Sequence, residues 1–340
     1  ASPNDELILG AMNCQKVFTG DLQWNHDGIW MPHRETVESV RWHDPDMLFF
    51  AGDQIYEGDL TPVDNRSTDH AMLDYLYKWY RFCWSFGELT KDRPTVTIPD
   101  DHDVYHGNIW GAGGKRAVKT GDITAQDSGG YRMPPEFVNM VHRTQTSHLP
   151  DPADPAPAEQ DISVYFTSLD WGGVSFAILA DRMFKSSPTI AVPGGEFRNG
   201  WPQAEGFKGT DADVEGAELL GDRQEAFLET WATRWEPGIR AKAVLSQTLF
   251  GNLNTLPPGG SSGSATARGA FPDPGDLPTD WSLAIDGDSN GWPQTPRNDA
   301  LRSMRKGFAF HVCGDQHLGS TVQYGIDEHE DAGWAFCVPA

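Results

Sequence analysis

The strongest constraint on the fold is a short apolar run that ends in acidic and aromatic side chains. Residues 47–51 read Met-Leu-Phe-Phe-Ala, and Gly52, Asp53 and Tyr56 follow. Such a run is typical of a strand buried on both faces in a layered α/β protein. Because ligands bind beyond the carboxyl ends of these strands, we expect Asp53 and Tyr56 to face a crevice. Taken alone, a turn-capping Asp and a packing Tyr explain the same residues equally well.

Two other apolar runs end in the same way. Residues 95–99 lead into Asp-Asp-His-Asp at 100–103, and residues 308–314 lead into Asp-Gln-His at 315–317. Several charged groups can share one pocket only around cations. Three such strand endings in one chain therefore predict a polynuclear metal site.

These motifs resemble those of the PhoD-like alkaline phosphatases and phosphodiesterases, which belong to the metallophosphoesterase superfamily. Gly52-Asp53-x-x-Tyr56 resembles the family's GDxxY element, and the stretches at 100–103 and 314–317 resemble its DDHE and GDxH elements. Residues 179–182 resemble its LDTR stretch and residues 13–15 its SCQ. Each motif is weak alone, but five in the family's order are hard to reach by chance.

The resemblance implies an α/β fold, a layered α/β/β/α sandwich of two mixed sheets flanked by helices. Residues 1–340 would form a single PhoD-like catalytic domain, without the β-sandwich that often precedes it in the family. The apolar pattern is unfinished at Ala340, so we expect the natural protein to continue.

The resemblance also implies a role for particular residues. It assigns a ferric ion (Fe³⁺) to Cys14, Asp53, Tyr56 and His317, and one or more divalent ions to Asp53, Asp101, Gln247 and Asp315, with Asn108 as a further oxygen ligand. Calcium (Ca²⁺) is the first choice for the divalent ions, and Mn²⁺, Mg²⁺ and Zn²⁺ are alternatives. The implied catalytic residues are His102, which would protonate or stabilise the leaving alkoxide, and Arg182, which would neutralise the phosphoryl oxygens.

Ligand chemistry agrees with some of the roles that the resemblance implies, and residue patterns alone leave others open. A thiolate and a phenolate on one ion favour ferric iron over calcium or magnesium. Gln247 stands where related purple acid phosphatases carry a metal-binding His, and its amide oxygen suits calcium. From the pattern alone, Asn108 is a turn residue, Cys14 a packing residue, and Arg182 equally well a surface ion pair.

Three departures from the family pattern indicate a distant branch. Gln54 follows the Gly-Asp pair, Asp103 replaces the Glu of DDHE, and Leu-Ala-Asp-Arg replaces LDTR. None of these removes an implied ligand, but the preference for monoesters or diesters stays open.

The net charge restricts the partners. A formal charge of −23 disfavours nucleic acid and anionic membranes, both of which bind through clustered Lys and Arg. It agrees with a phosphate substrate if part of the carboxylates hold cations, whose charge reverses the local field. We therefore expect a small-molecule phosphate ester as the partner, and the oligomeric state stays open.

The location is expected to be outside the cytoplasm. No apolar run approaches the roughly 18 residues of a membrane-spanning helix, and no signal peptide is present. The start at Ala1 suits a mature chain after removal of a leader. We expect a secreted or periplasmic protein.

The four cysteines show no zinc-binding spacing. Cys83 and Cys313 lie inside apolar runs, so we expect both to be buried structural thiols.

Periodicity predicts the order of the elements. Helices are expected near 35–42, 68–86 with Ser67 or Thr68 as its cap, 134–148, 221–235 and 298–306; strands at 6–13, 47–51, 95–99, 163–169, 174–180, 241–247, 308–314, 319–325 and 333–338; and loops at 24–32, 104–130, 183–218 and 249–297. The last loop is the expected substrate lid, with Trp281 and Trp292 exposed.

Two further hypotheses stay open. The same fold can carry a different hydrolase or transferase activity. A calcium-dependent carbohydrate-binding protein is suggested by 13 Trp, many Gly and the acidic composition. Cys14 and Tyr56 argue against the second hypothesis, since a calcium lectin needs neither.

Overall fold

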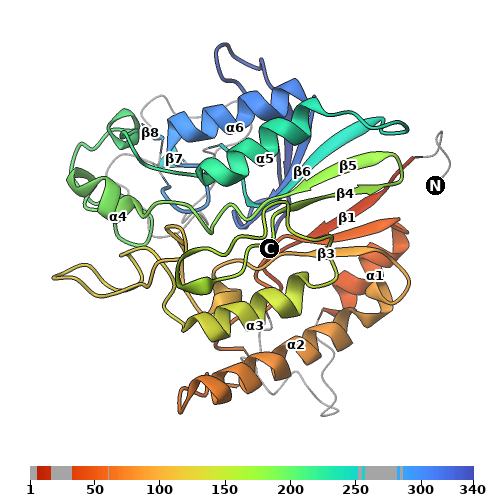
Figure 1. Ribbon diagram of the computed structural model, residues 1–340, viewed down its shortest axis with the longest axis horizontal. Helices are drawn as coiled ribbons and strands as arrows, with labels where there is room; N and C mark the ends of the chain where they lie inside the picture. Colours follow the sequence, from red (N-terminus) through yellow and green to blue (C-terminus); the bar gives the residue numbers. More distant parts are fainter. Residues whose placement is uncertain (1–5, 17–32, 60, 252–254, 257–281, 284–285) are drawn as a thin grey trace.

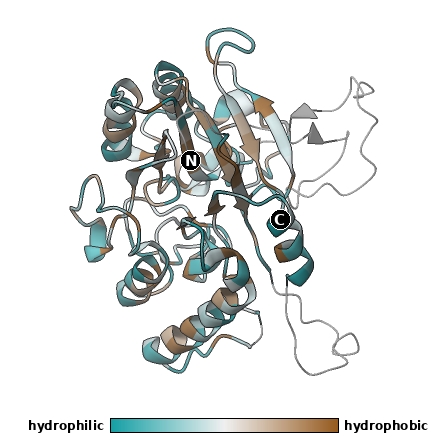
Figure 2. Ribbon diagram, turned by 90° about the vertical axis from the view of Figure 1, so that its right-hand side faces the viewer, coloured by the Kyte–Doolittle hydropathy of each residue, from teal (hydrophilic) through white to brown (hydrophobic). Residues whose placement is uncertain are grey.

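The molecule is built from two β-sheets that lie against one another between two groups of helices (Figure 1). The computed structural model describes residues 6–16, 33–59, 61–251, 255–256, 282–283 and 286–340. Figure 2 shows the most apolar residues on the central strands and hydrophilic residues on the outer turns of the helices. The predicted α/β/β/α layering is confirmed.

The smaller sheet holds three parallel strands in the order β1-β2-β3. They are β1 (Leu9–Met12), β2 (Met47–Phe50) and β3 (Thr95–Thr97). All four residues of β2 are buried, as its uninterrupted apolar run predicts. Helices α1 (Arg34–Trp42), α2 (Thr68–Thr90) and α3 (Pro135–Thr146) lie on this side of the molecule (Figure 1). The predicted cap of α2 is confirmed, since the Ser67 hydroxyl accepts a hydrogen bond from the backbone N–H of His70.

The larger sheet is mixed and has the order β10-β11-β9-β6-β5-β4. Its strands are β4 (Thr167–Trp171), β5 (Val174–Ile178), β6 (Ala241–Thr248), β9 (Phe310–Gly314), β10 (Ser320–Gln323) and β11 (Trp334–Cys337). The four inner strands are parallel, and β4 and β10 pair antiparallel at the two edges. Helices α5 (Gly221–Thr233) and α6 (Gln294–Lys306) cover its outer face (Figure 1). The short elements α4 (Pro188–Ala191), β7 (Thr255–Leu256) and β8 (Ser282–Leu283) lie in the connections.

Strand β5 illustrates why the two sheets pack together. Phe176 and Ile178 belong to the core shared with the smaller sheet, whereas Ala177 between them belongs to the core under α5 and α6. Successive side chains of a strand point to opposite faces, so one apolar run fills both cores. Each fully buried Phe or Ile contributes roughly 1.5–3 kcal/mol. This packing fixes the carboxyl ends of the parallel strands of both sheets.

A buried polar chain ties β6 and β9 to the residue after β10. The Tyr324 hydroxyl, 2.8 Å from Nδ1 of His311, accepts from the backbone N–H of Phe250, and Nε2 of His311 lies 2.6 Å from the Ser246 hydroxyl. Ser246 in turn donates to the Thr248 carbonyl oxygen. One neutral tautomer of His311 satisfies all these contacts, and burial lowers the pKa of His311 to about 3. The side chains of this hydrogen-bond network are all buried, so we interpret the network as structural.

Three expectations from the sequence were wrong in detail. Cys83 is exposed, because the buried face of α2 runs through Tyr75, Phe82 and Phe86, and one position along a helix rotates a side chain away from that face. Trp292 is buried, and its indole N–H donates to the Ala212 carbonyl oxygen at 2.8 Å. The strand expected at 163–169 lies at Thr167–Trp171, so the β4–β5 turn consists of Gly172 and Gly173, both with positive φ.

Part of the predicted loops falls outside the described residues. This holds for the 24–32 loop, for Trp281 and for most of the 249–297 segment expected to form a lid. No helix in the described part of the chain has the length and apolar character to cross a membrane.

The buried His142 on α3 generates a prediction about acid stability. Its Nδ1 lies 2.8 Å from the Ser163 carbonyl oxygen, and burial lowers its pKa from 6.5 to about 4. Between these two pH values the unfolded chain binds a proton at His142 that the folded chain does not bind. The contribution of neutral His142 to the free energy of unfolding is therefore complete above pH 6.5 and is lost as pH falls toward 4. The variant His142→Asn keeps an N–H donor and removes the titratable imidazole. Between pH 7.5 and 5, urea unfolding should show the wild type losing about 1–2 kcal/mol more than the variant. Equal losses would contradict this account.

Candidate metal centre

The candidate site lies where strands from both sheets end. Cys14 follows β1, Asp53 follows β2, and Asp315 follows β9 directly. All three have positive φ, at 48°, 56° and 63°. Non-glycine residues rarely adopt this conformation, and it persists where the surrounding structure holds it, often at functional sites.

The ligand atoms at these strand ends form two groups that share one carboxylate. Cys14, Asp53 and Asp315 make the first group, and Asp53, Asp100 and Asp101 make the second. Within each group the ligand atoms lie within 4.8 Å of one another. If each group held a cation, Asp53 would be a ligand to both.

The acidic groups are too close and too buried to ionise together without cations. Burial raises the pKa of Asp101 and Asp315 well above the ordinary value, and neighbouring carboxylates raise it further, although Arg182 lowers it in part. Burial raises the pKa of Asp100 to about 7 in spite of Arg182. One carboxylate oxygen of Asp101 is buried without a hydrogen-bond partner. This set of donors fits multivalent cations, which supply the missing positive charge.

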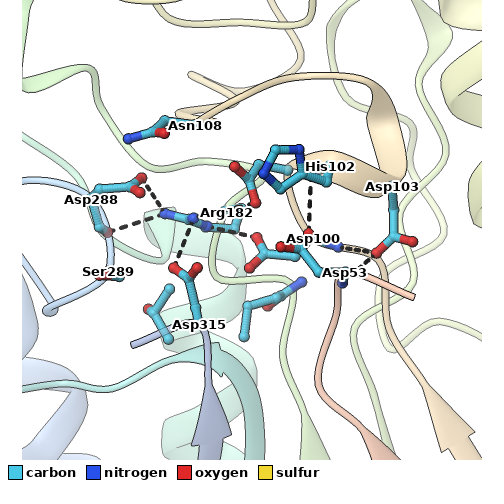
Figure 3. A network of polar contacts seen from close by, with 12 residues as sticks. Asp53, Asp100, His102, Asp103, Asn108, Arg182, Asp288, Ser289 and Asp315 are labelled. Atoms are coloured by element: carbon cyan, nitrogen blue, oxygen red, sulfur yellow. Dashed lines mark hydrogen bonds and ion pairs between the residues drawn. The ribbon is translucent and has the colours of Figure 1, made fainter. Parts of the chain in front are cut away.

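Arg182 follows β5 and links carboxylates from three segments (Figure 3). Its Nε donates to Asp100 at 2.7 Å, Nη1 to Asp288 at 2.6 Å and Nη2 to Asp315 at 2.9 Å. The side chain is 3% exposed. In this arrangement Arg182 holds the acidic side chains in position, and its role as a clamp for substrate stays a prediction.

His102 lies at the mouth of the site and is oriented by an acidic partner. Its Nδ1 is 2.7 Å from a carboxylate oxygen of Glu57, and its backbone N–H donates to Asp53 at 3.1 Å. Burial lowers the pKa of His102, but the charges of Asp53 and Glu57 outweigh this effect and raise it to about 9. These charges favour the protonated imidazole, which is the form that a general acid needs.

Tyr56 and Cys14 lie together beside Asp53. The hydroxyl of Tyr56 and the thiol of Cys14 interact electrostatically, and the Cys14 thiol is 3.7 Å from a carboxylate oxygen of Asp53. Burial and the charge of Asp53 raise the pKa of both groups. Both would deprotonate on a cation, whose charge reverses these effects.

A cavity of about 160 Å³ opens over these residues. Its lining includes Asp53, Asp101, His102, Asn108, Asn199, Trp201, Asp286, Asp288, Asp315 and His317. A larger cavity of about 660 Å³ lies between α5 and the β4–β5 hairpin, but none of the clustered acidic ligands lines it. The smaller cavity is the candidate functional one, because three of the clustered carboxylates, those of Asp53, Asp101 and Asp315, line it.

The structure brings nearly all of the predicted site residues together. His317 and Asn108 line the cavity, and the amide nitrogen of Asn108 donates to the Asn199 carbonyl oxygen at 3.2 Å. Gln247 does not line it: its amide oxygen accepts from the backbone N–H of Asp181, and its amide nitrogen donates to Pro99 and Tyr165. In the described structure Gln247 joins strand ends to one another.

The sequence profile of the PhoD-like phosphatase family matches residues 9–340. The chain belongs to the PhoD-like phosphatase family.

Solved structures agree with this family at the level of the fold. The chain is similar to a structure described as that of PhoD, with 15% identity and a TM-score of 0.60, over 98% of this chain and 56% of that chain. It is also similar to a dimetal phosphatase from Danio rerio, with 11% identity and a TM-score of 0.51, over 98% of this chain and 87% of that chain. The chain thus spans little more than half of the PhoD structure. No curated protein sequence matches it.

Sequence patterns do not point to several residues of the candidate site. Asp100 lies in a predicted motif but is not among the predicted ligands, although it belongs to the second group. Glu57 carried no signal that it would orient His102. Asp286 and Asp288 lie in an Asp-Gly-Asp-Ser-Asn run within the long Pro- and Gly-rich stretch, and this run of oxygen-bearing side chains was the available clue.

Asp103 is the structural centre of this PhoD-like site. One of its oxygens accepts from the backbone N–H of Asp53 at 2.7 Å and of Asp100 at 2.9 Å. The other accepts from Ile55 at 3.0 Å and from the side chain of Gln145 at 2.8 Å. A carboxylate is required here, because all four partners are donors.

Asp103→Asn should therefore destabilise the protein and loosen the metal site. Either orientation of the amide points its NH₂ group at two N–H donors, so we expect a loss of about 3 kcal/mol in urea unfolding. Metal affinity measured by calorimetry should fall roughly 10- to 100-fold, as for other groups that orient ligands.

The matched control is Asp122→Asn, because Asp122 is exposed. It should stay within about 0.5 kcal/mol of the wild type. Wild-type stability and metal affinity in Asp103→Asn would contradict the structural role of Asp103.

Proposed function

We propose that this chain is a metal-dependent phosphoesterase, an alkaline phosphatase or phosphodiesterase that hydrolyses small phosphate esters. The observation that carries the proposal is the pair of ligand groups that share Asp53. Two cations on a shared carboxylate form the arrangement that clamps both the attacking and the leaving oxygen of a phosphoryl group. Membership of the PhoD-like phosphatase family supports the same activity.

The donors favour different ions in the two groups. Cys14, with Tyr56 beside it, offers a thiolate and a phenolate, which suit Fe³⁺. The group of Asp53, Asp100 and Asp101 offers only carboxylate oxygens, which suit Ca²⁺. When bound, such ions polarise the phosphoryl group and activate a water molecule for attack.

The residues around the ions complete the chemistry. Glu57 holds Nδ1 of His102, which leaves Nε2 to face the substrate. His102 gives the Nε2 proton to the leaving alkoxide oxygen and then regains a proton from solvent. Arg182 fixes Asp100 and Asp315 so that the carboxylates meet the ions without rearrangement.

Hydrolysis of p-nitrophenyl phosphate and bis(p-nitrophenyl) phosphate tests the proposal. The protein supplied with Fe³⁺ and Ca²⁺ should release p-nitrophenol, and chelation should lower kcat/KM roughly a thousandfold or more, because the ions supply several kcal/mol. Asp53→Asn should cause a similar loss, since Asp53 belongs to both groups. The control Asp122→Asn should keep wild-type activity. If the metal-loaded protein cleaves neither ester, the proposed function is wrong.

Glu57→Gln tests the role of His102. The charge of Glu57 helps to raise the pKa of His102 to about 9, so its removal lowers that pKa. The basic limb of the kcat profile should move to lower pH by on the order of one unit.

Glu136→Gln, at an exposed position on α3, is the matched control and should leave the profile unchanged. A basic limb that stays in place in Glu57→Gln would mean that His102 is not the proton donor.

A further inference from the structure

Cys313 and Cys337 lie directly opposite one another on neighbouring parallel strands. Cys313 is in β9 and Cys337 in β11, and the strand register pairs the two residues. Neighbouring strands are about 4.8 Å apart. This spacing falls within the range of roughly 4.4–6.8 Å between Cα atoms that a disulfide bridges.

The two side chains also share one environment. Both belong to the core under α5 and α6, with exposures of 0% and 4%. Each thiol acts electrostatically on the other, and both are free cysteines in this structure. Cys14 and Cys83 lie elsewhere, at the metal centre and on the exposed side of α2.

The pair lies beneath the turn that carries two of the metal-site residues. Sγ of Cys337 is 3.5 Å from the Gly314 carbonyl oxygen. Cys313 and, to a smaller extent, the neighbouring backbone of Gln316 lower the pKa of the Cys337 thiol. The backbone N–H of Val338 donates to the Cys313 carbonyl oxygen at 2.9 Å. The end of β11 thus supports the turn at 315–317.

We propose that Cys313 and Cys337 form a reversible disulfide that ties β11 to β9 beneath this turn. A small disulfide such as oxidised glutathione is the oxidant. One cysteine thiolate attacks it and releases one glutathione thiol, and the second cysteine then displaces the other. Two S–H bonds of the protein are lost and one S–S bond forms, while the oxidant gains two electrons and two protons as two thiols.

Burial determines when this exchange takes place. Both sulfur atoms are inside the core, so the oxidant reaches them when the short strand β11 opens locally or before it pairs. Once formed, the bond restricts the opening of the last strands and stabilises the fold.

Thiol counting by mass spectrometry tests the proposal in Cys83→Ser, which removes the exposed thiol. The full chain is incubated with oxidised glutathione, either folded or after refolding from urea in the same buffer. It is then quenched with acid, denatured and alkylated. We expect one alkyl group before reduction, on Cys14, and three after reduction, with a cross-linked peptide that joins Cys313 and Cys337.

Thermal unfolding provides the second measurement. The oxidised protein should melt roughly 5 °C higher than the reduced protein. Cys83→Ser combined with Cys337→Ser should show no such difference. Three alkylated thiols before reduction in both samples, or mixed glutathione adducts in place of the cross-linked peptide, would overturn the proposal. Equal melting temperatures of the oxidised and the reduced protein would contradict the proposed stabilisation by the disulfide.

Discussion

Repulsion among buried carboxylates is the constraint on which the rest of this structure depends. Four carboxylates meet at the ends of three strands, those of Asp53, Asp100, Asp101 and Asp315. All four are at least nine-tenths buried, and all except Asp53 lie within ion-pair reach of Arg182. Two like charges a few Å apart in a poorly solvated site cost several kcal/mol. One guanidinium cannot balance four carboxylates. The charge pattern therefore favours a folded state that binds cations.

Packing and hydrogen bonds of the fold oppose the repulsion among these carboxylates. Parallel strands in two sheets direct their carboxyl ends to a common edge, and the shared core holds the sheets at a fixed spacing. At that edge Asp103 accepts four hydrogen bonds and sets the backbone on which Asp53 and Asp100 stand. The cost of crowding the carboxylates is thus met by packing and hydrogen bonds that lie outside the cavity itself.

Local patterns predicted the strands and the residues that follow them, because a short stretch of sequence is enough to show the apolar periodicity of a buried strand. They placed Asp53, Asp101 and Asp315 at one edge. The metal role that the resemblance implies for Gln247 depends on long-range packing, and in the structure its amide is occupied by Asp181 and Pro99. Glu57 and Asp288 acquire their roles only when distant loops meet His102 and Arg182. For Glu57 no local pattern carries that information, and for Asp288 the run of oxygen-bearing side chains at 286–290 indicates a polar site but not its partner.

The most direct test of the central claim is anomalous diffraction from crystals of the protein loaded with Fe³⁺ and Ca²⁺, recorded on both sides of the iron absorption edge. The account predicts two peaks about 3.5–4 Å apart, one on each side of Asp53. Only the peak beside Cys14 and Tyr56 should change strongly across the edge. A single peak, or none within bonding distance of Asp53, would contradict the claim that this carboxylate joins two metal ions.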